Sequence, residues 1–249
     1  MTGLRFDDVH VRYGRGRRAV DAVRGITLDV PDGSVVGVVG ESGSGKSTLA
    51  RTAVGLAPLS RGAVLLDGRP VESWHVRGQA RPVQMVFQDP YSSLDPRMSV
   101  GASIAEAMIG ERDRARRRAE TERLLDLVGL DPGRASAKPA ALSGGQRQRV
   151  ALARALAAQP RVIIADEITS ALDVSVQGAV LNLVRRLTQE LGLTIVFISH
   201  NLAVTRYLAD RIAVVRDGEL VEEGPTLQVL HDPATDYTRA LLDAVPRLP

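Results

Sequence analysis

The chain has 249 residues, of which 44% are apolar and 24% charged, as in a globular protein with one large domain or a domain with an insert. The net charge is only +3, which is weak evidence for nucleic-acid binding, and the absence of cysteine excludes disulfides, cysteine zinc sites and iron–sulfur clusters. No segment has the composition of a signal peptide, and no apolar run approaches the roughly 18 residues that span a bilayer. We therefore expect a soluble or peripheral chain, whose role in any transport would use the membrane helices of another polypeptide.

The first third of the chain is predicted to consist mainly of strands and turns. Apolar and polar residues alternate or form short β-branched runs between turn residues, as strands do. Strands or hairpins are expected over residues 4–13, 19–30, 35–39, 63–71 and 83–87. A helix is expected from about Ser47 through Leu56.

The middle third has helical periodicity and no predicted strand. Helices are expected over residues 99–110, 111–130 and 143–158, with Ser143 as an N-cap and a loop over 131–141. We interpret this part as an inserted helical subdomain over residues 89–160.

Strands and helices alternate again from Arg161. Strands are expected over 162–166 and 194–199, helices over 174–191 and 201–208, and a hairpin over 212–222. This alternation predicts a parallel sheet with helices on both faces, in an α/β core made of residues 1–88 and 161–224.

The strongest motif is a phosphate-binding loop between a predicted strand and a predicted helix. It has the pattern G-x-x-x-x-G-K-[ST] and comprises Gly40, Glu41, Ser42, Gly43, Ser44, Gly45, Lys46, Ser47 and Thr48. Its glycines allow a backbone conformation in which successive N–H groups surround an anion at a helix N-terminus. Lys46 would bridge the β- and γ-phosphates of ATP, and the Ser47 hydroxyl would bind Mg²⁺. The alternative is a plain glycine-rich turn.

Two acidic residues, Asp166 and Glu167, end a buried predicted strand. This is the edge at which an α/β sheet binds its ligand. Asp166 can hold Mg²⁺, and Glu167 can polarise a water molecule that attacks the γ-phosphate. The alternative is that both acids only cap the next helix.

A second anion site is predicted at the start of the helix that follows Leu142. Ser143, Gly144, Gly145 and Gln146 place a hydroxyl and flexible N–H groups at a helix N-terminus. One nucleotide does not need both sites from the same molecule. The pattern therefore favours a head-to-tail dimer, although a simple N-cap would also explain Ser143.

These motifs, together with Ser170-Ala171-Leu172-Asp173 and His200, resemble in order and spacing the ATPase subunits of ABC transporters over essentially the whole chain. The resemblance implies a P-loop NTPase (RecA-like) fold with a mostly parallel sheet, an antiparallel β-subdomain and the helical insert. It implies that Tyr13 stacks on adenine, that Gln88 contacts Mg²⁺ and the attacking water, and that His200 touches the γ-phosphate. Asp173 is expected at the dimer interface.

Each of these roles has a plainer alternative. Tyr13 could pack on an edge strand, Gln88 could be a turn residue, His200 could end its strand as a cap, and Asp173 could cap the next helix. Ile168 stands where the family usually has proline, which would affect the rate of turnover more than nucleotide binding.

A closer resemblance is to the importer branch for oligopeptides, dipeptides and nickel. The segment from Gln88 to Met98 and the tail from Pro225 to Pro246 resemble that branch. The implied protein uses ATP and Mg²⁺ on the cytoplasmic face of the membrane. Its implied partners are two permease subunits, a second nucleotide-binding subunit and, indirectly, an extracytoplasmic substrate-binding protein.

Two other functions remain open at this point. The chain could be the accessory ATPase of a soluble complex such as phosphonate C–P lyase, which shares all the nucleotide motifs. A DNA-repair or translation ATPase would usually add zinc cysteines, a coiled-coil insert or a second cassette. The arginines over residues 112–118 alternate with acidic residues and lack stacking aromatics, so we expect a solvated helix face and no nucleic-acid partner.

Overall fold

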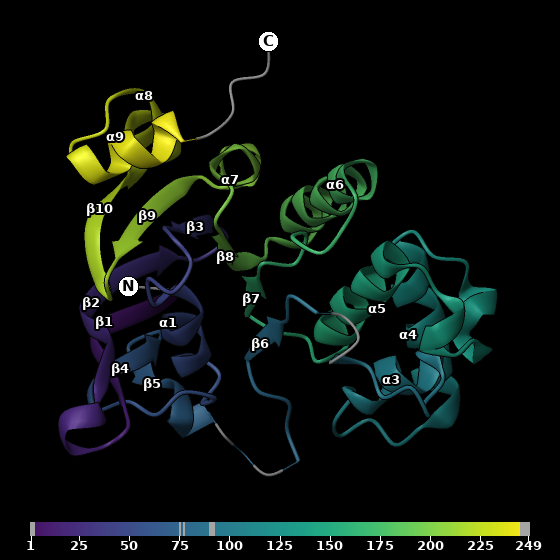
Figure 1. The fold of residues 1–249 in the computed structure, drawn as a ribbon. Coiled ribbons are helices and arrows are strands. Elements are labelled where there is room, and N and C mark those ends of the chain that lie inside the picture. The colour runs from purple at the N-terminus through teal and green to yellow at the C-terminus, as the bar shows by residue number, and fades with distance from the viewer. Residues whose placement is uncertain (1–2, 75, 77, 90–92, 245–249) are drawn as a thin grey trace. The chain divides into compact units, whose positions relative to one another are not determined.

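The computed structural model describes residues 3–74, 76, 78–89 and 93–244, and Figure 1 shows its fold. The chain divides into two compact units. The first unit comprises the residues up to Glu72 together with those from Thr188 onward, and the second unit runs from Ser73 to Leu187.

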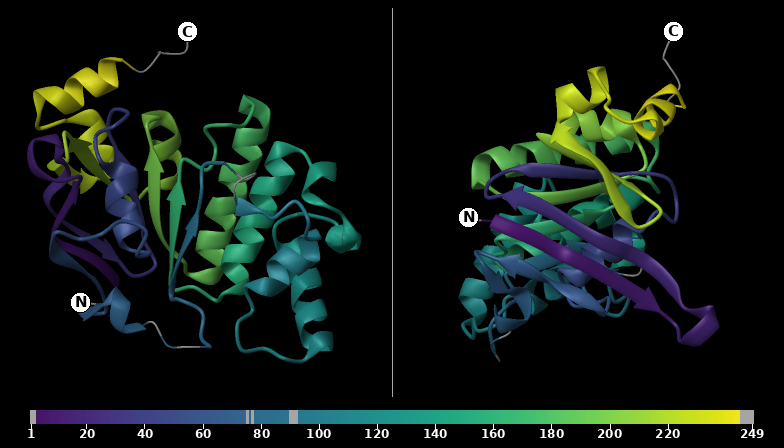
Figure 2. Two further views of the ribbon diagram at one scale, coloured as in Figure 1. Left: turned by 60° about the horizontal axis from the view of Figure 1, so that its bottom comes forward. Right: turned by 90° about the vertical axis from the view of Figure 1, so that its left-hand side faces the viewer.

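An antiparallel sheet forms the N-terminal half of the first unit, with the strand order β2-β1-β4-β5. Its strands are β1 (Gly3–Tyr13), β2 (Val20–Pro31), β4 (Arg61–Leu66) and β5 (Arg69–Pro70). The long β1 and β2 form the ribbon drawn in purple in the right-hand view of Figure 2. Alternation along β1 buries Leu4 and Phe6, while the intervening residues stay partly exposed.

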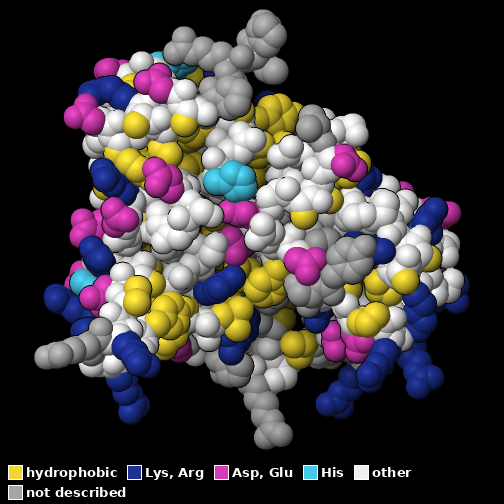
Figure 3. All heavy atoms as spheres, in the orientation of Figure 1, with side chains coloured by type: hydrophobic (Ala, Val, Ile, Leu, Met, Phe, Trp, Pro, Cys, Tyr) yellow, Lys and Arg dark blue, Asp and Glu magenta, His cyan; other side chains and the backbone are white. Residues whose placement is uncertain are grey.

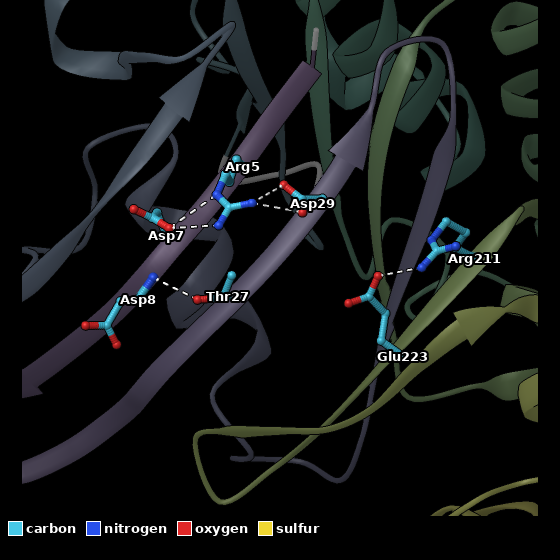
Figure 4. A network of polar contacts seen from close by, with 7 residues as sticks. All are labelled: Arg5, Asp7, Asp8, Thr27, Asp29, Arg211 and Glu223. Atoms are coloured by element: carbon cyan, nitrogen blue, oxygen red, sulfur yellow. Dashed lines mark hydrogen bonds and ion pairs between the residues drawn. The ribbon is translucent and has the colours of Figure 1, made fainter. Parts of the chain in front are cut away.

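Charged pairs line the solvent side of these strands, as Figure 4 shows. Arg5 lies opposite Asp29 in the β1–β2 register and donates to both of its carboxylate oxygens at 3.0 Å. Asp7 accepts further hydrogen bonds from Arg5. Exposed pairs of this kind contribute little to stability, so they favour the register more than they stabilise the fold.

The second sheet of the first unit is mostly parallel. Within this unit its strands lie in the order β10-β9-β3-β8, with β9, β3 and β8 parallel and β10 antiparallel to β9. The strands are β3 (Val35–Val39), β8 (Thr194–Ser199), β9 (Arg211–Arg216) and β10 (Glu219–Pro225). Every residue of β3 and β8 is buried, as apolar runs in parallel sheets require.

Four helices and a short 3₁₀ turn complete the first unit. They are α1 (Lys46–Thr52), α7 (Leu202–Leu208), α8 (Thr226–His231), α9 (Asp236–Asp243) and η1 (Gly16–Arg18). Helices α8 and α9 lie beyond the end of β10 in both figures. A buried cluster there contains Val39, Ile212 and, from α8, Val229, and the partly buried Tyr237 and Leu241 of α9 pack against it.

The second unit combines a parallel strand pair with a group of helices. The strands are β6 (Val83–Val86) and β7 (Val162–Asp166). The helices are α3 (Val100–Glu106), α4 (Arg114–Leu127), α5 (Gly144–Ala157) and α6 (Val174–Leu191). The last turn of α6 extends past Leu187, where the second unit ends. Three 3₁₀ turns are η2 (Val71–Trp74), η3 (Pro132–Ser136) and η4 (Pro139–Ala141). Helices α3, α4 and α5 pack together around Ile104, Leu124, Leu125 and Val150.

The predicted elements are present, with differences at their ends. Helix α1 ends at Thr52 and not near Leu56, because Gly55 adopts a φ of 72° and the Leu56 N–H turns back to the Arg51 carbonyl at 2.9 Å. Helix α4 is shorter than predicted because the Asp113 side chain caps its start. Helices α8 and α9 of the tail were not predicted. Pro90, Tyr91, Ser92, Val245 and Pro246 lie outside the described residues.

Candidate functional site

The phosphate-binding loop, residues 40–48, follows β3 and leads into α1, as its motif requires. Gly40, Gly43 and Gly45 have φ values of 149°, 83° and 103°. A Cβ on Gly40 would lie 2.0 Å from the Val215 carbonyl oxygen, and one on Gly45 would lie 2.3 Å from the Ala22 carbonyl oxygen. Two of the three glycines are therefore required both by their conformation and by close backbone neighbours.

The neighbouring backbone also holds the loop through hydrogen bonds. The Gly218 N–H, in the turn between β9 and β10, donates to the Ser44 carbonyl at 2.9 Å. The Arg24 N–H of β2 donates to the Gly218 carbonyl at 2.8 Å. The loop is thus hydrogen-bonded to the β9–β10 turn, which is hydrogen-bonded in turn to β2.

Lys46 is buried, at 4% exposure, and its ammonium group lies over the loop. Its Nζ donates to the carbonyl oxygens of Gly40 at 2.9 Å and Glu41 at 2.6 Å, and to the Ser44 hydroxyl at 3.3 Å. A buried ammonium beside the N-terminus of a helix is a positive charge suited to a polyphosphate.

His200 lies next to the entry of the loop. The β3–β8 register pairs Val39 with Ser199, so Gly40 and His200 leave adjacent parallel strands at the same edge of the sheet. His200 is exposed there. Tyr13 ends β1 with 42% of its side chain exposed, which leaves its ring accessible.

The predicted acids of the second unit end β7. Asp166 is buried, at 4% exposure, and Glu167 is half-buried with a φ of 48°, an uncommon left-handed conformation for a residue with a side chain. Residues in such conformations cluster at active sites and ligand-binding sites, and Asp8, Asp67, Gln159 and Asp217 share this conformation in the described part of the chain.

Gln88 is connected to this acidic turn through Ser170. Its Nε2 donates to the Ser170 hydroxyl at 3.0 Å, and that hydroxyl donates to the Glu167 carbonyl at 2.9 Å. The β6–β7 register pairs Val86 with Ala165, which brings Gln88 to the edge where the acids lie. The Ser170 bridge was not predicted, because a serine in a turn carries no signal for this role.

Ser143 is exposed and begins α5 with a capping box. Its hydroxyl accepts from the Gln146 N–H at 3.3 Å, and its own N–H donates to the Gln146 side chain at 3.0 Å. The N–H groups of Gly144 and Gly145, in the first helical turn, have no acceptor within the helix. The helix start thus retains two donors for an anion.

The Gly-Gly pair also has a packing role that the sequence did not indicate. A Cβ on Gly145 would lie 2.3 Å from Cγ1 of Val176 in α6, whereas one on Gly144 would lie 3.3 Å from the end of the Leu172 side chain.

Two further residues from the sequence analysis differ in their exposure. Asp173 is exposed just before α6, whereas Ile168 is only 1% exposed. The side chain of Ile168, at the position where the family usually has proline, is therefore buried.

Three arginines of α4, Arg116, Arg118 and Arg123, pair with acids of the same helix or its cap. Arg118 contacts Glu122 at 2.9 Å, and Arg123 contacts Glu120 at 2.7 Å. The hydrogen bond from Arg123 holds the pKa of Glu120 below its ordinary value, against the opposing effect of burial. On the face drawn in Figure 3, basic and acidic side chains are interspersed.

Among the described residues, no group of three or more His, Cys, Asp or Glu side chains could hold a metal ion. No helix in the described part of the chain has the length and apolar character needed to cross a membrane.

Comparison with known proteins agrees with this site. The family model described as ABC transporter matches residues 23–170. The "Probable D,D-dipeptide transport ATP-binding protein DdpF" of Escherichia coli (strain K12) is 45% identical over 256 aligned residues, covering 99% of this chain and 80% of the relative. The glutathione import ATP-binding protein GsiA of Salmonella paratyphi A is 45% identical and covers 94% of this chain, which spans 38% of that protein.

A solved structure has the same fold. It is the dimeric, post-hydrolysis state of an ATP-binding cassette bound to ADP and Pi, with a TM-score of 0.78 and 30% identity, and the match covers 90% of this chain and 98% of the other. The predicted P-loop NTPase fold is thereby confirmed. The phosphate-binding loop, the strand-end acids, the signature motif (Ser143 to Gln146) at the capped start of α5 and these likenesses agree. The chain therefore belongs to the ABC transporter family, as one of its ATP-binding and ATP-hydrolysing subunits.

Proposed function

We propose that this chain powers an importer for oligopeptides or dipeptides, or for chelated nickel, as one half of a head-to-tail pair of nucleotide-binding subunits. We infer the pairing from the exposed, capped start of α5, because the same chain also has a complete phosphate-binding loop. The peptide cargo is supported by the relatives, which are named for D,D-dipeptide transport and glutathione import.

The phosphate-binding loop would bind the triphosphate of ATP through backbone N–H groups at the start of α1 and through the Lys46 ammonium. The left-handed glycines and the buried position of Lys46 support this role. Tyr13 would stack on the adenine ring, for which its exposed side chain is suited.

Ser47, Gln88 and Asp166 are the proposed Mg²⁺ ligands. A hydroxyl, an amide oxygen and a carboxylate are the hard oxygen donors that Mg²⁺ prefers, so this donor set fits the ion. When bound, Mg²⁺ neutralises the charge of the β- and γ-phosphates during transfer.

Glu167 is the proposed general base. Its carboxylate would accept a proton from the water that attacks the γ-phosphate, and His200 would donate a hydrogen bond to that phosphate. The Ser170 bridge joins Gln88 to the Glu167 backbone, which would let a displacement of Gln88 alter the position of the base. Catalysis by these groups consists of positioning and charge stabilisation.

The second copy would contribute its α5 start to the nucleotide. Ser143, Gly144, Gly145 and Gln146 would contact the γ-phosphate bound by the opposing loop, and Asp173 would lie at the interface. The exposure of Ser143 and Asp173 supports this arrangement. The helical subdomain over residues 89–160 would carry the signature motif.

The proposed partners are two permease subunits, an identical or paralogous nucleotide-binding subunit and, indirectly, an extracytoplasmic substrate-binding protein. The chain would then lie at the cytoplasmic face of the membrane. No nucleic-acid partner is proposed, because the arginines of α4 lie among acids, with which Arg118 and Arg123 pair.

A test is to purify the tagged full chain from membranes of its host and identify the proteins that accompany it. We expect two permeases, and we expect the same cells to lose uptake of a labelled dipeptide when Lys46→Ala replaces the wild type. The Lys46→Ala chain should still co-purify with the permeases, which separates assembly from turnover. Recovery of the chain in a soluble enzyme complex without permeases would instead favour the accessory-ATPase alternative.

A further inference from the structure

The C-terminal tail reaches the phosphate-binding loop through one side chain. The hydroxyl of Tyr237, in α9, accepts a hydrogen bond from the Glu41 N–H at 3.2 Å. The carbonyl of the same peptide group, that of Gly40, accepts from Lys46 Nζ at 2.9 Å. The peptide group between Gly40 and Glu41 is therefore held from both sides, by the tail and by the phosphate-binding lysine.

The position of the Tyr237 hydroxyl is set by the surroundings of its ring. The ring packs on the cluster that contains Val39 and Ile212, and the Arg216 guanidinium lies 4.9 Å from its centroid. Arg216 is next to Val215, whose carbonyl limits the space at Gly40. Tyr237 thus contacts the same strand, β9, whose Val215 carbonyl restricts the backbone at the start of the loop.

The start of α9 is fixed as well. The Glu222 carboxylate in β10 accepts from the N–H groups of Ala234 at 2.8 Å and Thr235 at 3.1 Å. The Thr235 hydroxyl caps α9 by accepting from the Thr238 N–H at 3.1 Å. These contacts hold the helix that presents Tyr237.

A glycine-rich loop has much backbone freedom to lose when it binds a ligand, so a contact that restricts it beforehand raises affinity. We propose that Tyr237 is a positioning residue for the phosphate-binding loop: its hydroxyl orients the Gly40–Glu41 peptide, and with it Lys46, so that the tail sets the affinity for nucleotide phosphates. This inference rests on the proposed binding of ATP phosphates by residues 40–48.

The test is Tyr237→Phe, which removes only the hydroxyl and keeps the ring on its cluster and beside Arg216. One hydrogen bond of net worth near 1 kcal/mol corresponds to a rise of about threefold to tenfold in the Kd for Mg·ATP, measured by calorimetry. The ATPase KM should rise by a similar factor, while kcat at saturating ATP stays within about twofold. The Glu41 amide hydrogen should also exchange faster with solvent.

Two further variants separate the possible failures. Tyr207→Phe, a matched change at a 42% exposed tyrosine of α7, should bind Mg·ATP like the wild type. If Lys46→Ala loses binding but Tyr237→Phe keeps the wild-type Kd, or loses only kcat, the role of Tyr237 is refuted and the loop assignment stands. If Lys46→Ala itself binds like the wild type, the loop assignment fails and the inference falls with it.

Discussion

Gly40 and Gly45 show at the scale of single residues why the phosphate-binding loop needs glycine. A Cβ at either position would collide with a carbonyl oxygen of the backbone, which has no rotamer by which to move away. Gly43 differs, because nothing lies within 4 Å of the Cβ position and only its φ of 83° favours glycine. The loop therefore contains two sterically required glycines and one required by conformation alone.

We expect Gly45→Ala to lose measurable Mg·ATP binding, because the loop or β2 must move to accommodate the methyl group. Gly43→Ala is the matched control, with a penalty of about 1 to 2 kcal/mol from the left-handed conformation. Titration with a fluorescent ATP analogue would rank the two variants. Equal affinities would show that the Ala22 contact does not constrain the loop.

Packing between α5 and α6 belongs to the scale of elements. Gly145 faces the branched side chain of Val176, so the second glycine of the signature motif serves helix contact as well as its proposed role toward phosphate. Alanine in a helix is otherwise more stable than glycine by about 1 kcal/mol. If Gly145→Ala lowers the stability of the chain, the cause must therefore be the contact with Val176.

Gly145→Ala should destabilise the chain by about 1 to 3 kcal/mol through overpacking. Val176→Ala in the same chain should recover most of this loss, because it removes the methyl groups that the new Cβ meets. Gly144→Ala is the control, since its nearest neighbour is the flexible end of Leu172. Urea denaturation of these three variants, of Val176→Ala alone and of the wild type would decide, and additive losses in the double variant would contradict the contact.

The docking of α9 should depend on pH through Glu222. Burial alone would raise the pKa of this carboxyl, but hydrogen bonds from Thr238, Ala234 and Thr235 outweigh it and hold the pKa below its ordinary value of 4.5. Because the folded-state pKa is the lower one, the carboxylate stabilises docking fully above pH 4.5 and loses this effect as pH falls through the folded-state pKa.

Glu222→Gln should accordingly lower the Tm by about 2 to 4 °C at pH 7, and the difference from wild type should shrink below pH 4.5. Scanning calorimetry at several pH values between about 3 and 7, a range that includes the ordinary pKa of a carboxyl, measures the Tm of the wild type and of the variant. Glu219→Gln, an exposed change in the same strand, is the control. A difference that stayed constant with pH would exclude the carboxylate as its cause.

At the scale of the whole molecule, each unit carries its own part of the proposed chemistry. The first unit has the phosphate-binding loop and His200, and the second has the acidic turn, Gln88 and the capped start of α5. A turnover cycle in which a pair of chains closes on nucleotide and reopens after hydrolysis would use both units of each chain.

Glu167→Gln tests this cycle. Gln keeps the size of the side chain but cannot accept a proton, so we expect Mg·ATP binding to persist while hydrolysis falls by about 100-fold to 10,000-fold. Closed dimers should then accumulate in Mg·ATP, as measured by light scattering after size exclusion. The same variant without nucleotide, and Lys46→Ala with it, should stay monomeric. A monomeric Glu167→Gln chain in saturating Mg·ATP would contradict the paired arrangement.

Much of the fold and the site could be predicted because the relevant residues are neighbours in the chain. The phosphate-binding loop, the N-cap at Ser143 and the strand that ends at Asp166 depend on short patterns of conformation and hydrogen bonding. Such patterns can be recognised in a segment of about ten residues, because glycine conformation, helix capping and strand alternation are all local effects.

Other features depend on residues far apart in the chain, and only tertiary packing brings these together. Ala22 and Val215 lie against the glycines of the loop, Ser170 joins Gln88 to Glu167, and Tyr237 reaches Glu41 from the tail. No local pattern marks these partners, because their meeting depends on how whole strands and helices pack. That packing converts an ordinary tyrosine near the C-terminus into a contact with the nucleotide-binding loop.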